Sequence, residues 1–130
     1  MSKRDVPKPT DAELVVLRVL WAEGPCTVRQ VYEVLARRRP LVYTTTLKLL
    51  QIMTEKGLTI RELYGQQHVY RPRHAQEETQ RRLVGDLLER AFGGSTANLV
   101  MQALASKPAS PEELREIRRL LAGRKEEGDV

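Results

Sequence analysis

Apolar residues recur at helical spacing directly after Thr10, and this pattern predicts the first helix of the chain. Glu13 stands three residues after Thr10, so the two residues form a capping box that marks a helix N-terminus. The dipeptide Gly24-Pro25 ends the pattern. The main apolar positions of this helix are Leu14, Leu17, Leu20 and Trp21.

Two further patterns predict a second and a third helix. Thr27 is the expected N-cap of the second helix, which ends before Pro40. The third is expected from residue 42 or 43 to Lys56, with Gly57 as its C-terminal cap. At about 100° per residue, its polar and apolar residues fall on opposite sides. The polar side holds Thr44, Lys48, Gln51 and Glu55, and the apolar side holds Thr46, Leu49, Leu50 and Met53.

The next stretch predicts a β-hairpin. Residues 58–63 and 68–72 are rich in β-branched and aromatic side chains, and Gly65 lies in the turn between them. Pro72 ends the second strand.

Three more amphipathic helices are predicted after the hairpin. Gly93-Gly94 separates the first from the second, and the capping box at Ser110 starts the third. The tail from Gly123 onward is polar and is expected to be frayed. The apolar stripes of these three helices include Leu83, Leu87, Leu88, Leu99, Leu104, Leu114, Ile117 and Leu121.

This order of elements predicts a mainly α (α+β) fold. Residues 1–73 are expected to form an N-terminal winged helix-turn-helix with a two-stranded wing, and residues 74–130 a three-helix C-terminal dimerisation domain. About 50 residues in three helices make a poor core alone, so a homodimer is expected to bury their stripes. The alternative is that these helices fold back on the N-terminal unit of the same chain.

Charge is divided unequally between the two halves. The chain has a net charge of +5 over 130 residues. Residues 1–73 carry 13 basic and 7 acidic side chains, a net of +6, whereas residues 74–130 carry 9 and 10, a net of −1. This asymmetry favours a polyanion-binding unit followed by a neutral unit, although a solvated charged surface would give the same count.

A winged helix-turn-helix places its third helix in the major groove of double-stranded DNA and its wing beside phosphates. Thr44 and Thr45 have hydroxyl and methyl groups suited to phosphates and thymine methyls, unless one of them caps the helix. The expected DNA-binding residues are Thr44, Thr45, Lys48 and Gln51 on the third helix and Arg61, Arg71 and Arg73 on the wing.

Other functional classes have little support in the sequence. The single cysteine, Cys26, excludes an intramolecular disulfide and a multi-cysteine zinc site, and His68 and His74 lack the spacing of a metal pair. No nucleophile–base pair or phosphate-cradling glycine loop indicates an enzyme, and no metal or other cofactor is expected. No apolar run approaches the ~20 residues of a membrane-spanning helix, so a cytoplasmic location is expected.

The motifs in their order resemble the BlaI/MecI family of bacterial transcriptional repressors, the penicillinase-repressor group. The resemblance covers about residues 8 to 122. It is carried by Pro9-Thr10-Asp11-Ala12-Glu13-Leu14, Thr27-Val28-Arg29-Gln30-Val31, Tyr43-Thr44-Thr45-Thr46, Glu55-Lys56-Gly57-Leu58 and Tyr70-Arg71-Pro72.

The resemblance implies a repressor that binds palindromic promoter operators as a homodimer. In β-lactam-responsive members, a membrane sensor-protease triggers cleavage between an asparagine and a phenylalanine in the second C-terminal helix. Asn98-Leu99 stands at the matching place, with leucine instead of phenylalanine. Copper-sensing relatives have a cysteine-rich C-terminal motif, which is absent here because no cysteine follows Cys26.

Two functions therefore remain in competition. The first is a sequence-specific transcriptional repressor, and the second is a winged-helix protein-interaction module without sequence-specific DNA binding. The +6 charge of residues 1–73 favours the first.

Overall fold

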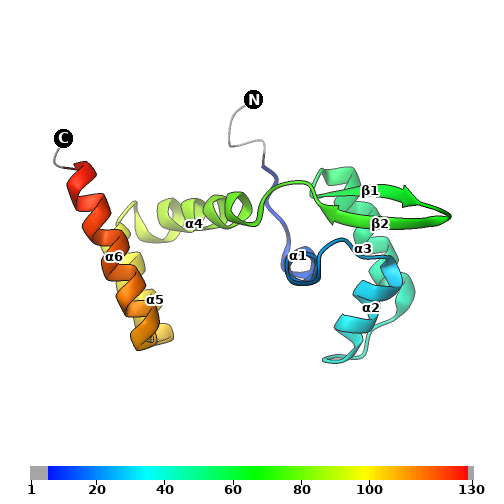
Figure 1. The fold of residues 1–130 in the computed structure, drawn as a ribbon, viewed down its shortest axis with the longest axis horizontal. Helices are drawn as coiled ribbons and strands as arrows, with labels where there is room; N and C mark the ends of the chain where they lie inside the picture. The colour runs from blue at the N-terminus through cyan, green and yellow to red at the C-terminus, as the bar shows by residue number, and fades with distance from the viewer. Residues whose placement is uncertain (1–5, 129–130) are drawn as a thin grey trace. The chain divides into compact units, whose positions relative to one another are not determined.

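The computed structural model of the protein describes residues 6–128 and divides the chain into two compact units, Met1–Asp86 and Leu87–Val130 (Figure 1). The predicted mainly α fold with a two-stranded wing is confirmed. The elements of the described residues are α1 (Asp11–Glu23), α2 (Val28–Ala36), α3 (Tyr43–Lys56), β1 (Thr59–Tyr64), β2 (Gln67–Pro72), α4 (Gln76–Phe92), α5 (Thr96–Ser106) and α6 (Pro111–Gly128).

Capping boxes start α1 and α2, and their first residues, Thr10 and Thr27, are the two N-caps that the sequence predicts. The Thr10 amide donates to Glu13 Oε1 at 2.9 Å, and the Glu13 amide donates to Thr10 Oγ1 at 3.2 Å. Thr27 and Gln30 make the same pair of bonds at 2.8 and 3.2 Å. Each box satisfies backbone donors that the helix itself leaves unpaired, so the start of each helix is fixed by its sequence.

The core of the first unit lies between α1, α2, α3 and the hairpin. Full burial of one large apolar side chain contributes roughly 1.5–3 kcal/mol to the stability of the fold. Its largest fully buried side chains include Val16, Leu20, Val31, Leu50, Met53 and Tyr70. Trp21, Tyr32 and Tyr43 are partly buried, and Trp21 and Tyr43 pack against this core.

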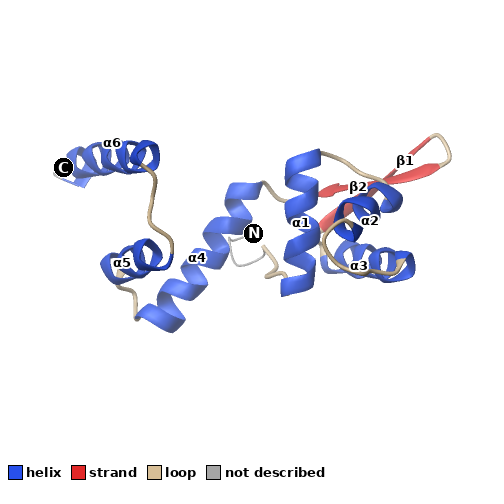
Figure 2. Ribbon diagram, turned by 90° about the horizontal axis from the view of Figure 1, so that it is seen from below, coloured by secondary structure: helices blue, strands red, loops and turns tan. Residues whose placement is uncertain are grey.

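The wing is an antiparallel hairpin in which Thr59 faces Pro72 and Tyr64 faces Gln67 (Figure 2). A short bridge ties it to the loop before α2. The Cys26 amide donates to the Tyr70 carbonyl at 3.0 Å, and the Tyr70 amide donates to the Cys26 carbonyl at 2.7 Å. Burial and the nearby Glu23 charge raise the pKa of the Cys26 thiol, so this cysteine stays a neutral packing residue.

The first part of α4 belongs to the first unit. Val6 and Thr79 are both buried there, and Arg82 Nε donates to the Val6 carbonyl at 3.4 Å. Lys8 Nζ lies 2.6 Å from Asp86 Oδ2. By these contacts the units divide inside α4, after Asp86, and not at residue 73, where the charge and the motifs of the sequence change.

The second unit contains the last turns of α4 with α5 and α6. Ser95 caps α5 and Ser110 caps α6. The sequence predicts fraying from Gly123, whereas α6 continues to Gly128. No residue from 87 to 124 is buried. Among the described residues, no helix is both long and apolar enough to cross a membrane.

Candidate nucleic-acid interface

Helix α3 separates its polar and apolar residues as predicted. Thr46, Leu50 and Met53 are buried in the core. The expected DNA-binding residues of this helix lie on its exposed side, and these are Thr44, Thr45, Lys48 and Gln51. Gly57 ends the helix in the left-handed region with φ 84°, which turns the chain into the wing.

The N-terminus of α3 is not capped by a side chain. Its N-cap is Val42, which has no capping hydrogen bond, so neither Thr44 nor Thr45 has the capping role that was considered from the sequence. The helix begins at Tyr43, which places both hydroxyls inside the first turn. Both threonine side chains are therefore available to a ligand on the exposed side.

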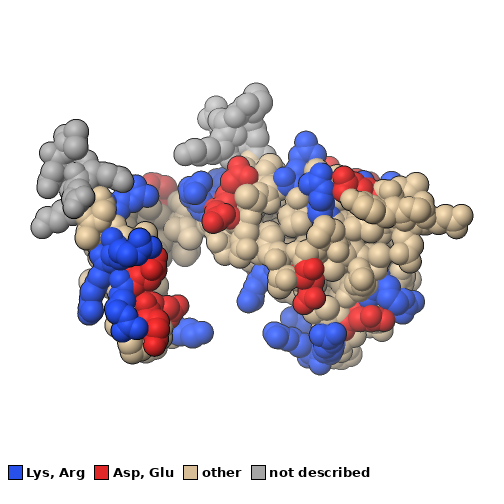
Figure 3. All heavy atoms as spheres, in the orientation of Figure 1, with Lys and Arg blue, Asp and Glu red and all other residues tan. Residues whose placement is uncertain are grey.

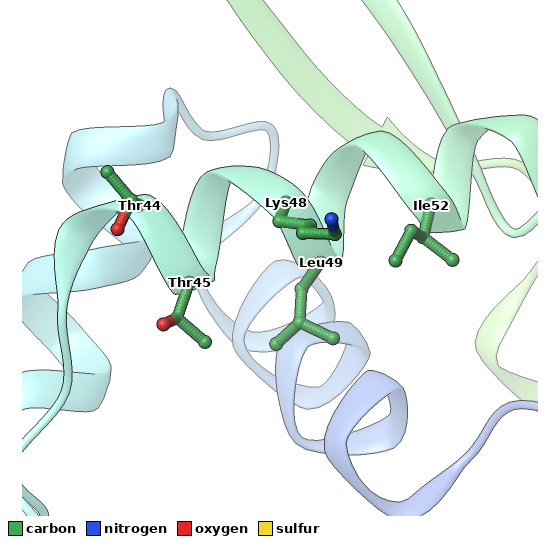
Figure 4. A pocket seen from close by; sticks show the side chains of 5 residues that line it. All are labelled: Thr44, Thr45, Lys48, Leu49 and Ile52. Carbon is green, nitrogen blue, oxygen red and sulfur yellow. The ribbon is translucent and has the colours of Figure 1, made fainter.

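Thr44, Thr45 and Lys48 line one open depression on the surface of α3 (Figure 4). Leu49 and Ile52 complete it, and Ile52 has 37% of its surface exposed. Leu49 is thus found beside Thr45 and Lys48 although its place in the sequence predicts the apolar side of the helix, and Ile52 was not among the expected interface residues. Their spacing after Thr45, four residues and then three, is the signal that would have placed them beside it.

The two arginines inside the strands of the wing, Arg61 and Arg71, lie on opposite faces of the hairpin. Arg61 is paired with Tyr70 in the register, and it lines a second depression with Gln51 and Glu55 of α3. Arg71 is paired with Ile60 instead, so its side chain points to the other face. Its Nε donates to Glu62 Oε1 at 3.1 Å. Only Arg61 is thus brought together with the exposed side of α3.

Arg73 lies at the base of the wing. Its amide donates to the Leu58 carbonyl at 3.0 Å, and its side chain is exposed. The tip of the wing, residues 63–68, contains no lysine or arginine, and it exposes the large side chains of Leu63 and Tyr64, each at 63%.

Arginines also gather at the end of α2. Figure 3 shows Lys and Arg atoms collected at this end and in the loop that follows, where Arg37, Arg38 and Arg39 are all exposed. Arg29, nearer the start of α2, lies over the ring of Tyr43, with 4.9 Å between the guanidinium carbon and the ring centroid. Arg29 was not among the residues expected to bind DNA.

The eight residues expected to form a dimer interface are distributed over α4, α5 and α6. Leu87, Leu104 and Leu121 are exposed. The partly buried members are Leu83, Leu88, Leu99, Leu114 and Ile117. Leu83 lies in the first unit and the others lie in the second.

The expected cleavage site lies in the first turns of α5. Asn98 is exposed and Leu99 is partly buried. The Asn98 amide donates to Ser95 Oγ and the Leu99 amide to the Ser95 carbonyl, both at 3.1 Å. The Asn98–Leu99 peptide bond is therefore held in helical conformation.

Metal-binding side chains are scattered over the part of the chain that the structure describes. No three of its His, Cys, Asp and Glu side chains lie close enough together to hold a metal ion.

The order of elements and the exposed polar side of α3 define a protein of the winged helix-turn-helix class. A family model described as penicillinase repressor matches residues 9–123. The chain belongs to this family, which confirms the resemblance deduced from the motifs. The family is one of repressors and not of enzymes, as expected.

Two curated relatives of the chain carry regulator names. The chain is 33% identical over 113 residues to the transcriptional regulator BlaI of Mycobacterium tuberculosis, covering 86% of this chain and 81% of that protein. It is 24% identical over 118 residues to the penicillinase repressor of Bacillus licheniformis, covering 91% and 92%.

A solved structure is similar to the N-terminal part of the fold. It is the solution structure of the monomeric form of Bacillus licheniformis BlaI in complex with the blaP half-operator. Identity is 25% and the TM-score is 0.50, over 56% of this chain and 89% of that chain.

Proposed function

We propose that this protein is a transcriptional repressor that binds palindromic operator DNA as a homodimer. The observation that carries the proposal is the division of α3, with Thr46, Leu50 and Met53 in the core and Thr45 and Lys48 exposed. A helix held in this way can enter the major groove without giving up its packing. The related BlaI domain solved with a half-operator supports DNA as the ligand.

Each side chain of the exposed surface has a chemical role in this proposal. Lys48 donates to guanine or to a phosphate, and Gln51 hydrogen-bonds a base edge. Thr44, Thr45 and Ile52 offer methyl groups to thymine. Arg61 and Arg73 contact phosphates from the wing, and the uncapped amides of α3 are donors for a further phosphate.

The experiment is selection of a bound sequence from a pool of random duplexes of about 30 base pairs, long enough for two half-sites. We expect a palindromic site and about tenfold weaker binding of it by Lys48→Ala. Lys107→Ala removes an exposed lysine from the second unit and is the matched control. Equal binding of every duplex, or full affinity in folded Lys48→Ala, would favour the protein-interaction module instead.

The homodimer in this proposal is supported by exposed apolar side chains in the second unit. Leu87 is 50% exposed and Leu121 is 62% exposed in the single chain. Water-exposed leucines on successive helices are stabilised when a second copy covers them. Two-fold symmetry also matches a palindromic operator, because each protomer then faces one half-site.

The repressor is further proposed to be released by a membrane sensor-protease that cuts between Asn98 and Leu99. The exposed Asn98 side chain supports access by a protease. Because proteases bind extended chain, the first turn of α5 must open before the Asn98–Leu99 bond is cut.

A further inference from the structure

Tyr43 joins two elements of the helix-turn-helix through its ring. Tyr32 of α2 meets this ring edge-on, with 5.7 Å between the centroids and 70° between the planes. The Arg29 guanidinium carbon lies 4.9 Å from the Tyr43 centroid. Tyr43 is the first residue of α3 and directly precedes Thr44, so Arg29 is held beside the surface that we assign to DNA.

Arg29 is exposed and has no salt-bridge partner within the described part of the chain. Glu33, one helical turn further along α2, forms no salt bridge with it. Arg71 on the wing differs, because it already forms a salt bridge with Glu62. The charge of Arg29 is therefore not neutralised by a carboxylate among residues 6–124.

We propose that Arg29 binds a backbone phosphate of the DNA and that Tyr43 is the residue that positions it. This inference rests on the proposed function. A planar guanidinium held over a ring by a cation–π contact keeps N–H groups free for a ligand, and these match two phosphate oxygens at once. The contact with the ring also restricts the arginine before binding, so less side-chain entropy is lost when the phosphate arrives.

A phosphate contact has a signature that a purely structural role lacks. Each neutralised phosphate adds about 0.9 to the slope of log affinity against log salt concentration, whatever the DNA sequence. Arg29→Ala should lower this slope by about 0.9 for each protomer bound. It should weaken binding about tenfold per protomer, equally for the selected operator and for an unrelated duplex.

Conservative variants separate charge from position. Arg29→Lys keeps the charge, so the slope should stay while affinity falls, because an ammonium lacks the flat, two-pronged geometry. Tyr43→Phe keeps the ring and should bind DNA like the unsubstituted chain. Tyr43→Leu should weaken binding with little change in slope, and should add nothing further to Arg29→Ala.

The measurement is a fluorescence anisotropy titration at several salt concentrations, with the selected operator and an unrelated duplex of the same length. Arg118→Ala, which removes an exposed arginine of α6, is the charge control. Because Tyr43 packs on the core, its variants are accepted only if their melting temperature stays near that of the unsubstituted chain. If the Tyr43 variants melt at a lower temperature, the Arg29 variants alone decide whether Arg29 binds a phosphate.

The outcomes distinguish this inference from the proposed function. If no duplex is bound selectively by the unsubstituted chain, the proposed function fails. If Lys48→Ala weakens binding but Arg29→Ala leaves both affinity and slope unchanged, only the role of Arg29 is overturned. A loss of affinity in Arg29→Ala without a change of slope also overturns it, since no phosphate contact has then been lost.

Discussion

Lys56 Nζ lies 2.6 Å from Glu13 Oε1, and this ion pair joins the last residue of α3 to the first turn of α1. The same carboxylate oxygen accepts the Thr10 amide of the capping box. The Glu13 side chain is only 4% exposed, whereas that of Lys56 is 35% exposed. The pair therefore connects the helix that carries the candidate interface to the start of the fold.

We predict that Lys56→Met lowers the free energy of unfolding by about 1–2 kcal/mol, because it leaves the buried Glu13 charge without its lysine. Partial exposure of Lys56 limits the effect, since water can reach the site. Urea unfolding followed by circular dichroism measures it. Lys8→Met is the matched control, because the Lys8–Asp86 pair is more exposed and should contribute less than about 0.5 kcal/mol. Equal losses in both variants would contradict the prediction.

The pair of Glu13 and Lys56 also makes the stability of the fold depend on pH. Burial alone would raise the pKa of Glu13, but hydrogen bonds from Lys56 and the Thr10 amide and the Lys56 charge together lower it. Since the folded pKa is below the unfolded one, ionised Glu13 stabilises the fold fully above the unfolded pKa. This stabilisation is lost as the pH falls through the folded pKa. Lys56→Met should therefore lose less stability than the unsubstituted chain between about pH 5 and pH 3. If the free energy of unfolding fell equally with pH in Lys56→Met and in the unsubstituted chain, the pair would not have this role.

The faces of the wing predict unequal roles for its arginines. Arg61→Ala should lower DNA affinity and reduce the salt slope by about 0.9 for each protomer, because Arg61 lies with Gln51 beside α3. The double variant Arg71→Ala/Glu62→Ala should leave the DNA affinity and the salt slope unchanged, because it removes an ion pair with no net charge. The salt titrations of DNA binding described for Arg29 apply here. A loss in the double variant as large as in Arg61→Ala would show that the outer face also contacts DNA.

Local signals account for the parts of the fold that the sequence predicts. The capping boxes at Thr10 and Thr27 fix the start of α1 and α2, and Gly57 fixes the end of α3. These signals act within a few residues, so no tertiary contact is needed to recognise them. The two sides of α3 follow from helical periodicity in the same way.

Contacts between residues far apart in the chain account for what the sequence does not predict. Glu13 is recognisable as a cap, but its pairing with Lys56 spans 43 positions. Arg71 has a side chain suited to binding phosphate, yet the strand register places Glu62 beside it. Arg29 becomes noticeable only when the turn brings the ring of Tyr43 under it. Side-chain partners of this kind depend on packing, which residue type and spacing alone do not specify.

The apolar stripes of the second unit predict the effect of charge on assembly. Leu87→Asp together with Leu121→Asp should give monomers with weakened operator affinity, as measured by light scattering and anisotropy. Both side chains are at least half exposed in the single chain, so the substitutions should spare helix content. Gln102→Asp, which adds a charge on α5 away from the stripe, is the control. A doubly substituted protein that stays dimeric would exclude this interface.

The cap of α5 predicts the rate of proteolysis. Ser95→Ala removes the acceptor of the Asn98 amide, and loss of such a cap costs about 1 kcal/mol. The open form of the first turn should then increase roughly fivefold, with cleavage by the cognate sensor-protease rising in proportion. Mass spectrometry of the fragment ending at Asn98 measures the rate. Ser110→Ala removes the equivalent cap of α6 and should have no such effect. An unchanged rate in Ser95→Ala, or no fragment at all, would rule out cleavage through this opening.

Two neighbouring threonines of α3, one exposed and one buried, predict opposite outcomes for one substitution. Thr46 is fully buried, and its hydroxyl has no hydrogen-bond partner among the residues that the structure describes. Thr46→Val keeps the shape and removes the unpaired polar group, so the free energy of unfolding should rise by about 1 kcal/mol while DNA affinity stays constant.

Thr45 is exposed on the candidate interface, so Thr45→Val should leave stability within about 0.5 kcal/mol and lower operator affinity by the loss of its hydroxyl. Urea unfolding and anisotropy titration of both variants measure the two effects side by side. If Thr45→Val bound the operator normally and Thr46→Val did not, the side of α3 that we assign to DNA would be wrong. The two substitutions are chemically identical, so any difference between them comes from the side of the helix on which the threonine lies.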